Sequence, residues 1–273
     1  MLEINELETL KITAKNIRRS IVNMVYKASS GHPGGSLSVT DILNYLYFKE
    51  MNVDVNNSKS EFRDRLVLSK GHCSPALYAT LAEKGFFPKE DLDGFRKIDS
   101  YLQGHPDMKK IPGVDMTSGS LGQGLSVANG MAIAGKLDNK NYRVYCILGD
   151  GEIGEGQVWE AAMTSSHYKL DNLCVIVDNN NLQIDGTIEE VMNSYPIVDK
   201  FKSFGFNVIS IDGHDYNQID NAFIEAKKIK DKPTVIVAKT TKGKGISYME
   251  NQVGWHGKAP SQEEYEKALE ELN

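Results

Sequence analysis

The fold of this chain is decided by two runs of sequence, Val144-Tyr145-Cys146-Ile147-Leu148-Gly149-Asp150-Gly151 and Leu173-Cys174-Val175-Ile176-Val177-Asp178-Asn179-Asn180-Asn181. Each run begins with apolar residues and ends in a polar turn. Asp150 and Asn180 lie about 30 residues apart, which is the length of one strand–helix–strand unit. We therefore expect both side chains at the carboxyl ends of neighbouring parallel strands, the edge where open α/β sheets bind ligands.

The two side chains also suggest a ligand. An Asp between glycines is by itself often only a turn. A second cluster of Asp and Asn, at 178–181, follows the next predicted strand, and a simple turn does not account for both clusters. A carboxylate and an amide oxygen together suit a hard cation such as Mg²⁺, which keeps phosphate oxygens among its ligands. Asp150 and Asn180 thus predict a pyrophosphate that is anchored by a metal ion.

Composition narrows the class of protein. The chain has 273 residues, 40% hydrophobic and 25% charged, as expected for one α/β domain spanning 1–273. A net charge of −6 argues against nucleic acid as a partner, and no apolar run approaches a membrane span. The amino terminus is acidic and does not resemble a signal peptide. Cys146 and Cys174 lie within the apolar runs, so we expect reduced thiols and a cytoplasmic location.

Hydrophobic periodicity predicts strands that alternate with helices. We expect strands at 66–69, 144–148, 173–178, 207–211 and 234–238. We expect helices near 7–28, 39–49, 74–84, 125–136, 157–167, 216–229 and 261–272, with 29–35 as a loop. This alternation predicts a three-layer αβα fold around a mainly parallel sheet. The strands are almost entirely apolar, which predicts burial on both faces.

Four histidines share a local sequence context. His32, His72, His105 and His256 each lie beside Gly or Pro, in expected loops rather than on helix faces. They could simply be scattered loop residues. Loops at one sheet edge often carry function, however, and imidazoles suit proton transfer and hydrogen bonding to sugar hydroxyls or phosphates. We therefore treat these four histidines as candidate catalytic residues.

Two glycine-containing segments imitate nucleotide-binding motifs. Gly119-Ser120-Leu121-Gly122-Gln123-Gly124 resembles a dinucleotide fingerprint, but polar residues rather than a strand precede it. This argues against a NAD-dependent oxidoreductase, and the glycines instead let a backbone approach a ligand closely. Lys242-Gly243-Lys244-Gly245-Ile246-Ser247 lacks the spacing of a P-loop. We expect it to be a loop with two solvated lysines.

Taken together, these segments resemble the N-terminal, pyrophosphate-binding half of transketolase. The resemblance runs from about residue 15 to 260, and its blocks follow the family's order. The matching blocks are Ser30 to Gly35, Ser69 to His72, Gly104 to Asp107, Gly119 to Gly124, Gly149 to Glu160, Asp178 to Gly186 and Gly254 to Gly257. Ser120 departs from the proline that the family often has there, which implies a small local change.

The resemblance implies a thiamine diphosphate-binding fold and a role for individual residues. The metal ion, Mg²⁺ or otherwise Ca²⁺ or Mn²⁺, would be held by Asp150, by Asn180, which also belongs to the cofactor site, and by the backbone carbonyl of Leu182. The diphosphate would contact Gly151, His72 and His256.

The same resemblance places the rest of the cofactor and the substrate. Gly119 and Leu121 would lie against the pyrimidine or the central part of the cofactor, and Glu155 would face the partner cofactor across a dimer. The donor ketose would be surrounded by four histidines, His32, His72, His105 and His256.

A complete transketolase has a second α/β domain that supplies a glutamate to the cofactor, and this sequence has no room for it. The resemblance therefore implies the N-terminal subunit of a split transketolase. It would move a two-carbon ketol unit from a ketose phosphate to an aldose phosphate only with a separate C-terminal subunit, in an α2β2 assembly. Two alternatives remain open: a chain like the α subunit of a 2-oxo acid dehydrogenase, and a non-catalytic cofactor-binding module.

Overall fold

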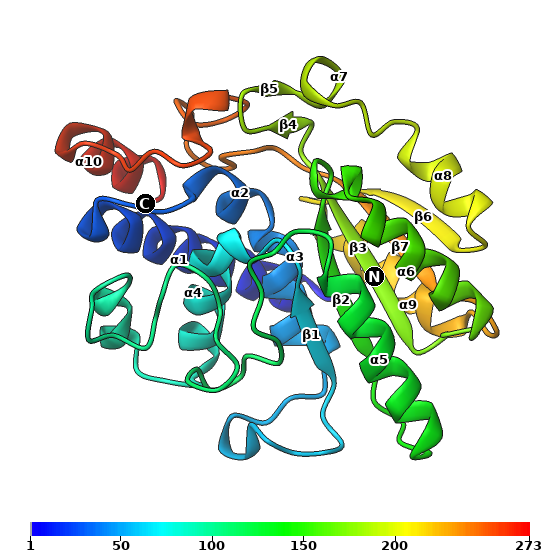
Figure 1. The fold of residues 1–273 in the computed structure, drawn as a ribbon. Coiled ribbons are helices and arrows are strands. Elements are labelled where there is room, and N and C mark those ends of the chain that lie inside the picture. The colour runs from blue at the N-terminus through cyan, green and yellow to red at the C-terminus, as the bar shows by residue number, and fades with distance from the viewer. Residues whose placement is uncertain (1) are drawn as a thin grey trace.

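A five-stranded parallel sheet lies at the centre of the computed structural model, which describes residues 2–273 (Figure 1). Its strand order is β1-β2-β3-β7-β6, and a separate antiparallel pair is formed by β4 and β5. The strands are β1 (Arg65–Leu68), β2 (Val144–Gly149), β3 (Leu173–Asn179), β4 (Leu182–Gln183), β5 (Gly186–Thr187), β6 (Asn207–Asp212) and β7 (Thr234–Lys239). The prediction of an α/β fold with a mainly parallel sheet is confirmed.

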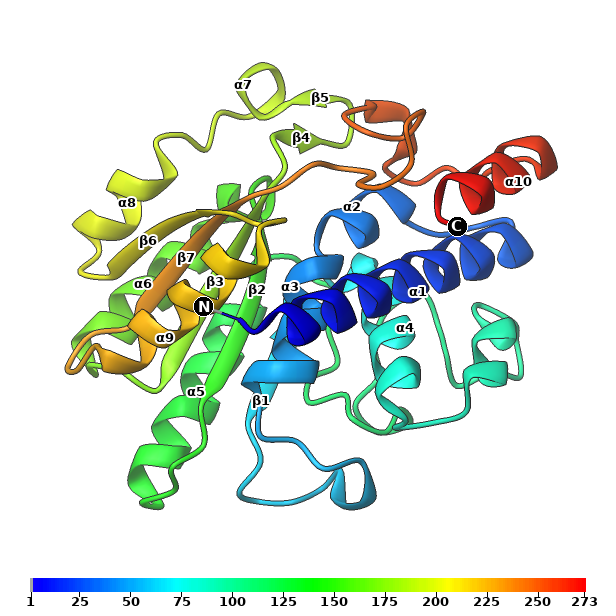
Figure 2. The same cartoon turned by 180° about the vertical axis from the view of Figure 1, so that it is seen from behind.

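Helices cover both faces of this sheet (Figures 1 and 2). They are α1 (Ile4–Ala28), α2 (Pro33–Ser38), α3 (Thr40–Tyr45), α4 (Ser74–Lys84), α5 (Gly124–Leu137), α6 (Gly156–His167), α7 (Ile188–Val191), α8 (Ile197–Ser203), α9 (Tyr216–Lys228) and α10 (Gln262–Glu271). α5, α6 and α8 bury apolar side chains in one layer, and α1, α3, α4 and α9 do so in the other. The result is three layers, helix on sheet on helix.

Alternation along β2 shows how one strand serves both layers. Tyr145 and Ile147 belong to the core beneath α3 and α9, where Tyr145 meets the ring of Phe223. Cys146 and Leu148 belong to the opposite core, beneath α5 and α6. Because side chains of a strand alternate between faces, an unbroken apolar run is required here.

Three sequence predictions need correction. Residues 29–35 were expected to form a loop, but a helix begins at Pro33, whose fixed φ suits a first helical position. The single helix expected at 39–49 is α3 followed by a π-helical turn, Leu46–Glu50. Burial on both faces is also wrong for β6, whose residues are mostly half-buried or exposed because it is an edge strand of the sheet.

Other expectations agree closely with the structure. The predicted helix at 74–84 is α4, and the helix predicted at 261–272 is α10. Ser261 caps α10 by accepting a hydrogen bond from the amide of Glu264. The three cysteines are free and buried. Within residues 2–273, every helix is too short or too polar to cross a lipid bilayer.

The carboxyl ends of three adjacent strands gather the segments that matter for function. Gly149 at the end of β2 pairs in register with Asp178 of β3, so Asp150 and Asn180 leave the sheet side by side. Asn179 pairs with Lys239 of β7, which leads into the Lys242 segment. In Figures 1 and 2 the β4–β5 hairpin lies above this same edge.

Candidate functional site

A cavity of about 260 Å³ opens at the carboxyl edge of the sheet. Its wall includes every predicted site residue except Glu155. These residues are His32, His72, His105, Gly119, Leu121, Asp150, Gly151, Asn180, Leu182 and His256. They come from seven separate stretches of the chain, and the topology of the sheet brings them together.

The Asp150 carboxylate is 2% exposed and is held by the backbone on two sides. It accepts hydrogen bonds from the amides of Gly151, at 2.9 Å, and Asn181, at 2.6 Å. Asn180 accepts a bond of 3.2 Å from the amide of Leu182. Burial and the nearby Asp178 carboxylate raise the pKa of Asp150 to about 7. A cation at this carboxylate would therefore relieve a charge that is costly to bury.

Three imidazoles pack against one another in the same cavity. The ring centroids of His32 and His72 are 5.2 Å apart, and each lies 5.4 Å from that of His256. Burial, reinforced by neighbouring positive groups, lowers the pKa of His32 and His72 to about 4 and that of His256 to about 3. Burial also lowers the pKa of His105. At neutral pH the cluster is thus uncharged and can both donate and accept hydrogen bonds.

A buried ion pair lies behind the cavity. Lys70 and Asp178 form a salt bridge, and the Lys70 ammonium also donates to the carbonyl of Gly35 at 3.1 Å. The Asp178 carboxylate accepts further bonds from the hydroxyls of Ser38, at 2.6 Å, and Thr240. Burial opposes ionisation of Asp178, but the ammonium of Lys70 lowers its pKa below the ordinary value. Lys70 therefore remains a fixed positive charge in the cavity wall.

Glu152 connects three backbone segments around the cavity. Its carboxylate accepts bonds from the Ser69 hydroxyl and from the amides of Gly122 and Gly149, both at 2.9 Å. Gly122 has a φ of +83°, which a residue with a side chain rarely adopts. Glu152 thereby holds the glycine-rich loop against the ends of β1 and β2.

Lys242 corrects the expectation of a solvated lysine. Its side chain is 2% exposed, and its ammonium lies 3.3 Å from the carbonyl oxygen of Leu182 and 3.1 Å from Nδ1 of His256. Burial, with the positive charge of Lys70, lowers the pKa of Lys242. The second lysine of the segment, Lys244, is partly exposed and pairs with Glu250.

Sequence reasoning missed three charged residues of this wall: Lys70, Glu152 and Lys242. Glu152 directly follows the predicted Gly151, and Lys70 lies two positions before the predicted His72, so closeness in sequence was the available signal. Glu155, in contrast, was predicted but lies outside the cavity wall. Glu155 is exposed at the start of α6. It lies beside Gly122, since a Cβ placed on Gly122 would be 2.7 Å from the Cβ of Glu155.

The glycine-rich segment behaves as expected from its sequence. No strand directly precedes Gly119 among the described residues, and α5 starts at Gly124. Gly119 lies against His105, since a Cβ there would meet the imidazole at 3.4 Å. The segment therefore borders the cavity and does not form a dinucleotide fingerprint.

Transketolases are among the known proteins to which this chain is similar. The family model for the transketolase, thiamine diphosphate binding domain, matches residues 9–272. The chain is 44% identical to one subunit of the apulose-4-phosphate transketolase of Phocaeicola vulgatus, covering 98% of this chain and 95% of that protein. It is 45% identical to the SqwG subunit of the 6-deoxy-6-sulfo-D-fructose transketolase of a Clostridium species, covering 96% of each.

A solved structure shows the same relationship. The transketolase of Campylobacter jejuni superimposes with a TM-score of 0.92 at 36% identity, over 99% of this chain but only 43% of that one. The human transketolase is 43% identical and is likewise covered over 42% of its length. This chain thus spans less than half of these longer relatives. With the fold, the matched residues and the identities in agreement, the chain belongs to the transketolase family, in its thiamine diphosphate-binding domain.

Proposed function

We propose that this chain, folded as one domain over residues 1–273, is the cofactor-binding subunit of a two-chain transketolase. The assembled enzyme moves a two-carbon ketol unit from a ketose phosphate to an aldose phosphate. The observation that carries the proposal is a single cavity that joins Asp150 and Asn180 to four imidazoles. Two relatives named as subunits match over 95% and 96% of their own lengths, which supports a separate second chain.

The chemistry of the donors at this edge fits a divalent cation. Asp150, Asn180 and the carbonyl of Leu182 offer only oxygen atoms, as Mg²⁺ prefers, and Ca²⁺ or Mn²⁺ would also suit them. The Leu182 carbonyl accepts a bond from the Lys242 ammonium, so a metal ion there would share this oxygen with Lys242. Among residues 2–273, no group of three or more His, Cys, Asp or Glu side chains could hold a metal ion. With one carboxylate, the proposed site depends on phosphate oxygens for tight binding.

The cavity also fits thiamine diphosphate. Two buried polar atoms in its wall, Nδ1 of His32 and Oε1 of Gln183, have no protein partner. The amide oxygen can accept a hydrogen bond from a ligand, and the imidazole nitrogen can accept or donate one. Lys70 and Lys242 supply positive charge for a diphosphate. When bound, the cofactor supplies the carbanion chemistry, and the protein supplies position and electrostatics.

Within that arrangement, individual residues take distinct tasks. Gly151, His72 and His256 would contact the diphosphate, and Asp150 and Asn180 would hold the metal ion. Gly119 and Leu121 border the ring portion of the cofactor.

The four imidazoles bind the sugar and exchange protons at its hydroxyls. Their low pKa values leave them neutral at pH 7, so each ring has one donor and one acceptor nitrogen. Nδ1 of His256 accepts a bond from Lys242, which assigns the proton to Nε2. Nε2 of His256 is then a donor for a ketose hydroxyl, while His32, His72 and His105 complete the sugar site.

The partner completes the site. The exposed carboxylate of Glu155, beside Gly122 but outside the cavity, suits a contact across an interface with the second cofactor of an α2β2 assembly. A transketolase needs a glutamate at the aminopyrimidine of its cofactor, and we assign that residue to the separate C-terminal subunit. The buried, free cysteines favour a reducing compartment such as the cytoplasm.

A reconstitution assay tests this function. The chain is purified with and without a candidate C-terminal subunit, and two-carbon transfer from xylulose 5-phosphate is measured alongside turnover of pyruvate. We expect transfer from the ketose phosphate only when both chains, thiamine diphosphate and Mg²⁺ are present. Turnover by this chain alone, or turnover of pyruvate instead, would contradict the proposal and in the second case favour a 2-oxo acid dehydrogenase.

A further inference from the structure

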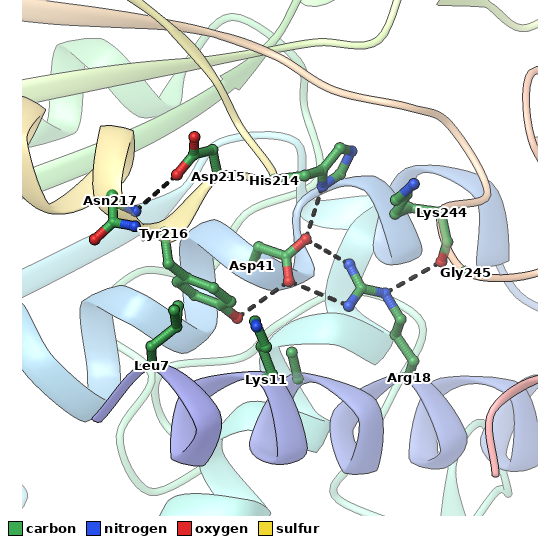
Figure 3. Close-up of a pocket in the computed structure, with 11 residues that line it drawn as sticks. Leu7, Lys11, Arg18, Asp41, His214, Asp215, Tyr216, Asn217, Lys244 and Gly245 are labelled. Carbon is green, nitrogen blue, oxygen red and sulfur yellow. Dashed lines mark hydrogen bonds and ion pairs between the residues drawn. The ribbon is translucent and has the colours of Figure 1, made fainter. Parts of the chain in front are cut away.

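A second polar cluster lies outside the cavity, beside the segment that carries Lys244 and Gly245 (Figure 3). It consists of Arg18 from α1, Asp41 from α3, His214 after β6 and Tyr216 at the start of α9. These residues line a surface cavity of about 530 Å³ together with Lys244 and Gly245. The cluster therefore lies where α1, α3, the loop after β6 and the start of α9 meet the segment that contains Lys244 and Gly245.

Asp41 is the centre of the cluster. Its carboxylate is 5% exposed and accepts two bonds from the Arg18 guanidinium, at 3.1 and 2.6 Å. It also accepts bonds from Nδ1 of His214, at 2.7 Å, and from the Tyr216 hydroxyl, at 3.1 Å. Burial opposes ionisation, but the Arg18 guanidinium and the bond from His214 lower the pKa of Asp41 to about 2. The carboxylate is therefore a fixed acceptor.

The other nitrogen of His214 reaches the active-site segment. The amide of Thr241 donates to Nε2 of His214 at 2.9 Å. Because Nε2 accepts this bond, the ring proton resides on Nδ1, where it is donated to Asp41. Only the neutral imidazole with its proton on Nδ1 satisfies both neighbours.

The cluster thus holds the backbone on both sides of Lys242. Thr241 is bound by His214, and the carbonyl of Lys244 accepts a bond of 3.1 Å from Nε of Arg18. Between these anchors, Lys242 reaches His256 and the carbonyl of Leu182. The same segment contains two glycines with positive φ, Gly243 and Gly245. Other backbone bonds run from the amide of Gly243 to the carbonyl of Gly34 and from the amide of Asn251 to the carbonyl of Lys242, so the anchors at Thr241 and Lys244 add to these.

We propose that His214, oriented by Asp41, is a positioning residue for the active site, since it fixes the backbone from which Lys242 reaches His256 and Leu182. His214 touches neither cofactor nor substrate. The effect of His214 on cofactor binding rests on the proposed function of the cavity that contains Lys242. Its effect on the backbone of Thr241 is independent of that function, so the two effects can be tested separately.

A matched pair of substitutions separates the two bonds of the ring. In His214→Asn the amide nitrogen takes the place of Nδ1 and keeps the bond to Asp41, but the side chain is too short to reach Thr241. In His214→Gln the longer side chain places its oxygen near the position of Nε2 and can accept the bond from Thr241. His167→Asn, at an exposed site on α6, is the control.

In the reconstituted two-chain enzyme, we expect His214→Asn to weaken thiamine diphosphate binding roughly three- to tenfold, as for the loss of one hydrogen bond. His214→Gln should recover most of this loss, and kcat at saturating cofactor should change less than the KM for cofactor. In the isolated full chain, the Thr241 amide should exchange faster and the His256 ring resonances should shift in His214→Asn only.

Cofactor affinities of both variants equal to that of wild type would overturn the proposal. So would unchanged exchange at Thr241 in His214→Asn, or exchange that rises equally throughout the chain. If the wild-type complex bound no cofactor, the proposed function would fail, but local exchange at Thr241 and the His256 resonances would still decide the positioning role.

Discussion

Oδ2 of Asp150 accepts a hydrogen bond of 2.6 Å from the backbone amide of Asn181, and this bond joins the turn after β2 to the turn after β3. The same Asp150 carboxylate takes the amide of Gly151 on its other oxygen. Two strand ends that pair in register are thereby fixed relative to each other at the edge where the cavity opens. The Asp150 carboxylate is thus both a structural acceptor and, in the proposed function, the one charged side chain that binds the metal.

Asp150→Asn tests the metal site. The amide keeps the shape of the side chain but removes its charge, so we expect Mg²⁺-dependent binding of thiamine diphosphate to weaken at least tenfold, by analogy with the roughly 10–100-fold effects of outer-shell changes. Calorimetric titration of the reconstituted enzyme measures this affinity with and without Mg²⁺. Asp138→Asn changes an exposed carboxylate after α5 and should have no effect. Equal affinity and equal metal dependence in Asp150→Asn would remove the metal assignment.

Glu152→Gln tests the acceptor that joins three loops. One carboxylate oxygen would become an amide group and would face an amide or hydroxyl donor that it cannot satisfy. We expect the free energy of unfolding to fall by about 1–3 kcal/mol, as for a buried donor left without a partner. Urea denaturation of the isolated chain measures it. Glu160→Gln, on the exposed side of α6, is the matched control, and equal losses in both variants would contradict this role for Glu152.

The histidine cluster predicts how stability depends on pH. The folded-state pKa of His72 is about 4 against an ordinary value of 6.5, because of burial and the nearby Lys70 ammonium. Below pH 6.5 the unfolded chain takes up a proton that the folded chain refuses, so the stabilisation is complete above this pH and is lost as pH falls toward about 4. We expect His72→Gln to show a smaller loss of stability between these two pH values. Denaturation of wild type and variant at several pH values measures this loss. An equal or larger loss of stability in the variant would contradict the prediction.

Lys242→Met tests the contact between the ammonium and His256. Burial is the first cause of the low pKa of His256, and the charge of Lys242 is the second. Removal of that charge should therefore raise the pKa of His256 while leaving it below its ordinary value. NMR titration of the imidazole in the isolated chain measures the shift. Lys244→Met removes a lysine that pairs with Glu250 instead, and a similar shift in both variants would show that the contact is unimportant.

Much of the fold was predictable because its signals are local. The apolar runs that form β2 and β3 end in polar turns, and α4 runs over the residues that periodicity predicts. The predicted site residues also converge, because neighbouring parallel strands present their carboxyl ends at one edge. Only Glu155 lies outside the cavity wall.

The sequence by itself determined the sheet, the edge at which the cavity opens and most of the predicted residues at that edge, since these follow from alternation, turn chemistry and strand order. Tertiary structure decided which charges are buried and what they touch. Lys70 meets Asp178 and His214 meets Asp41 across long stretches of chain, and Lys242 is withdrawn from solvent by the packing of the β4–β5 hairpin and the His256 loop. Such contacts depend on how distant segments pack, and no local pattern in the sequence records them.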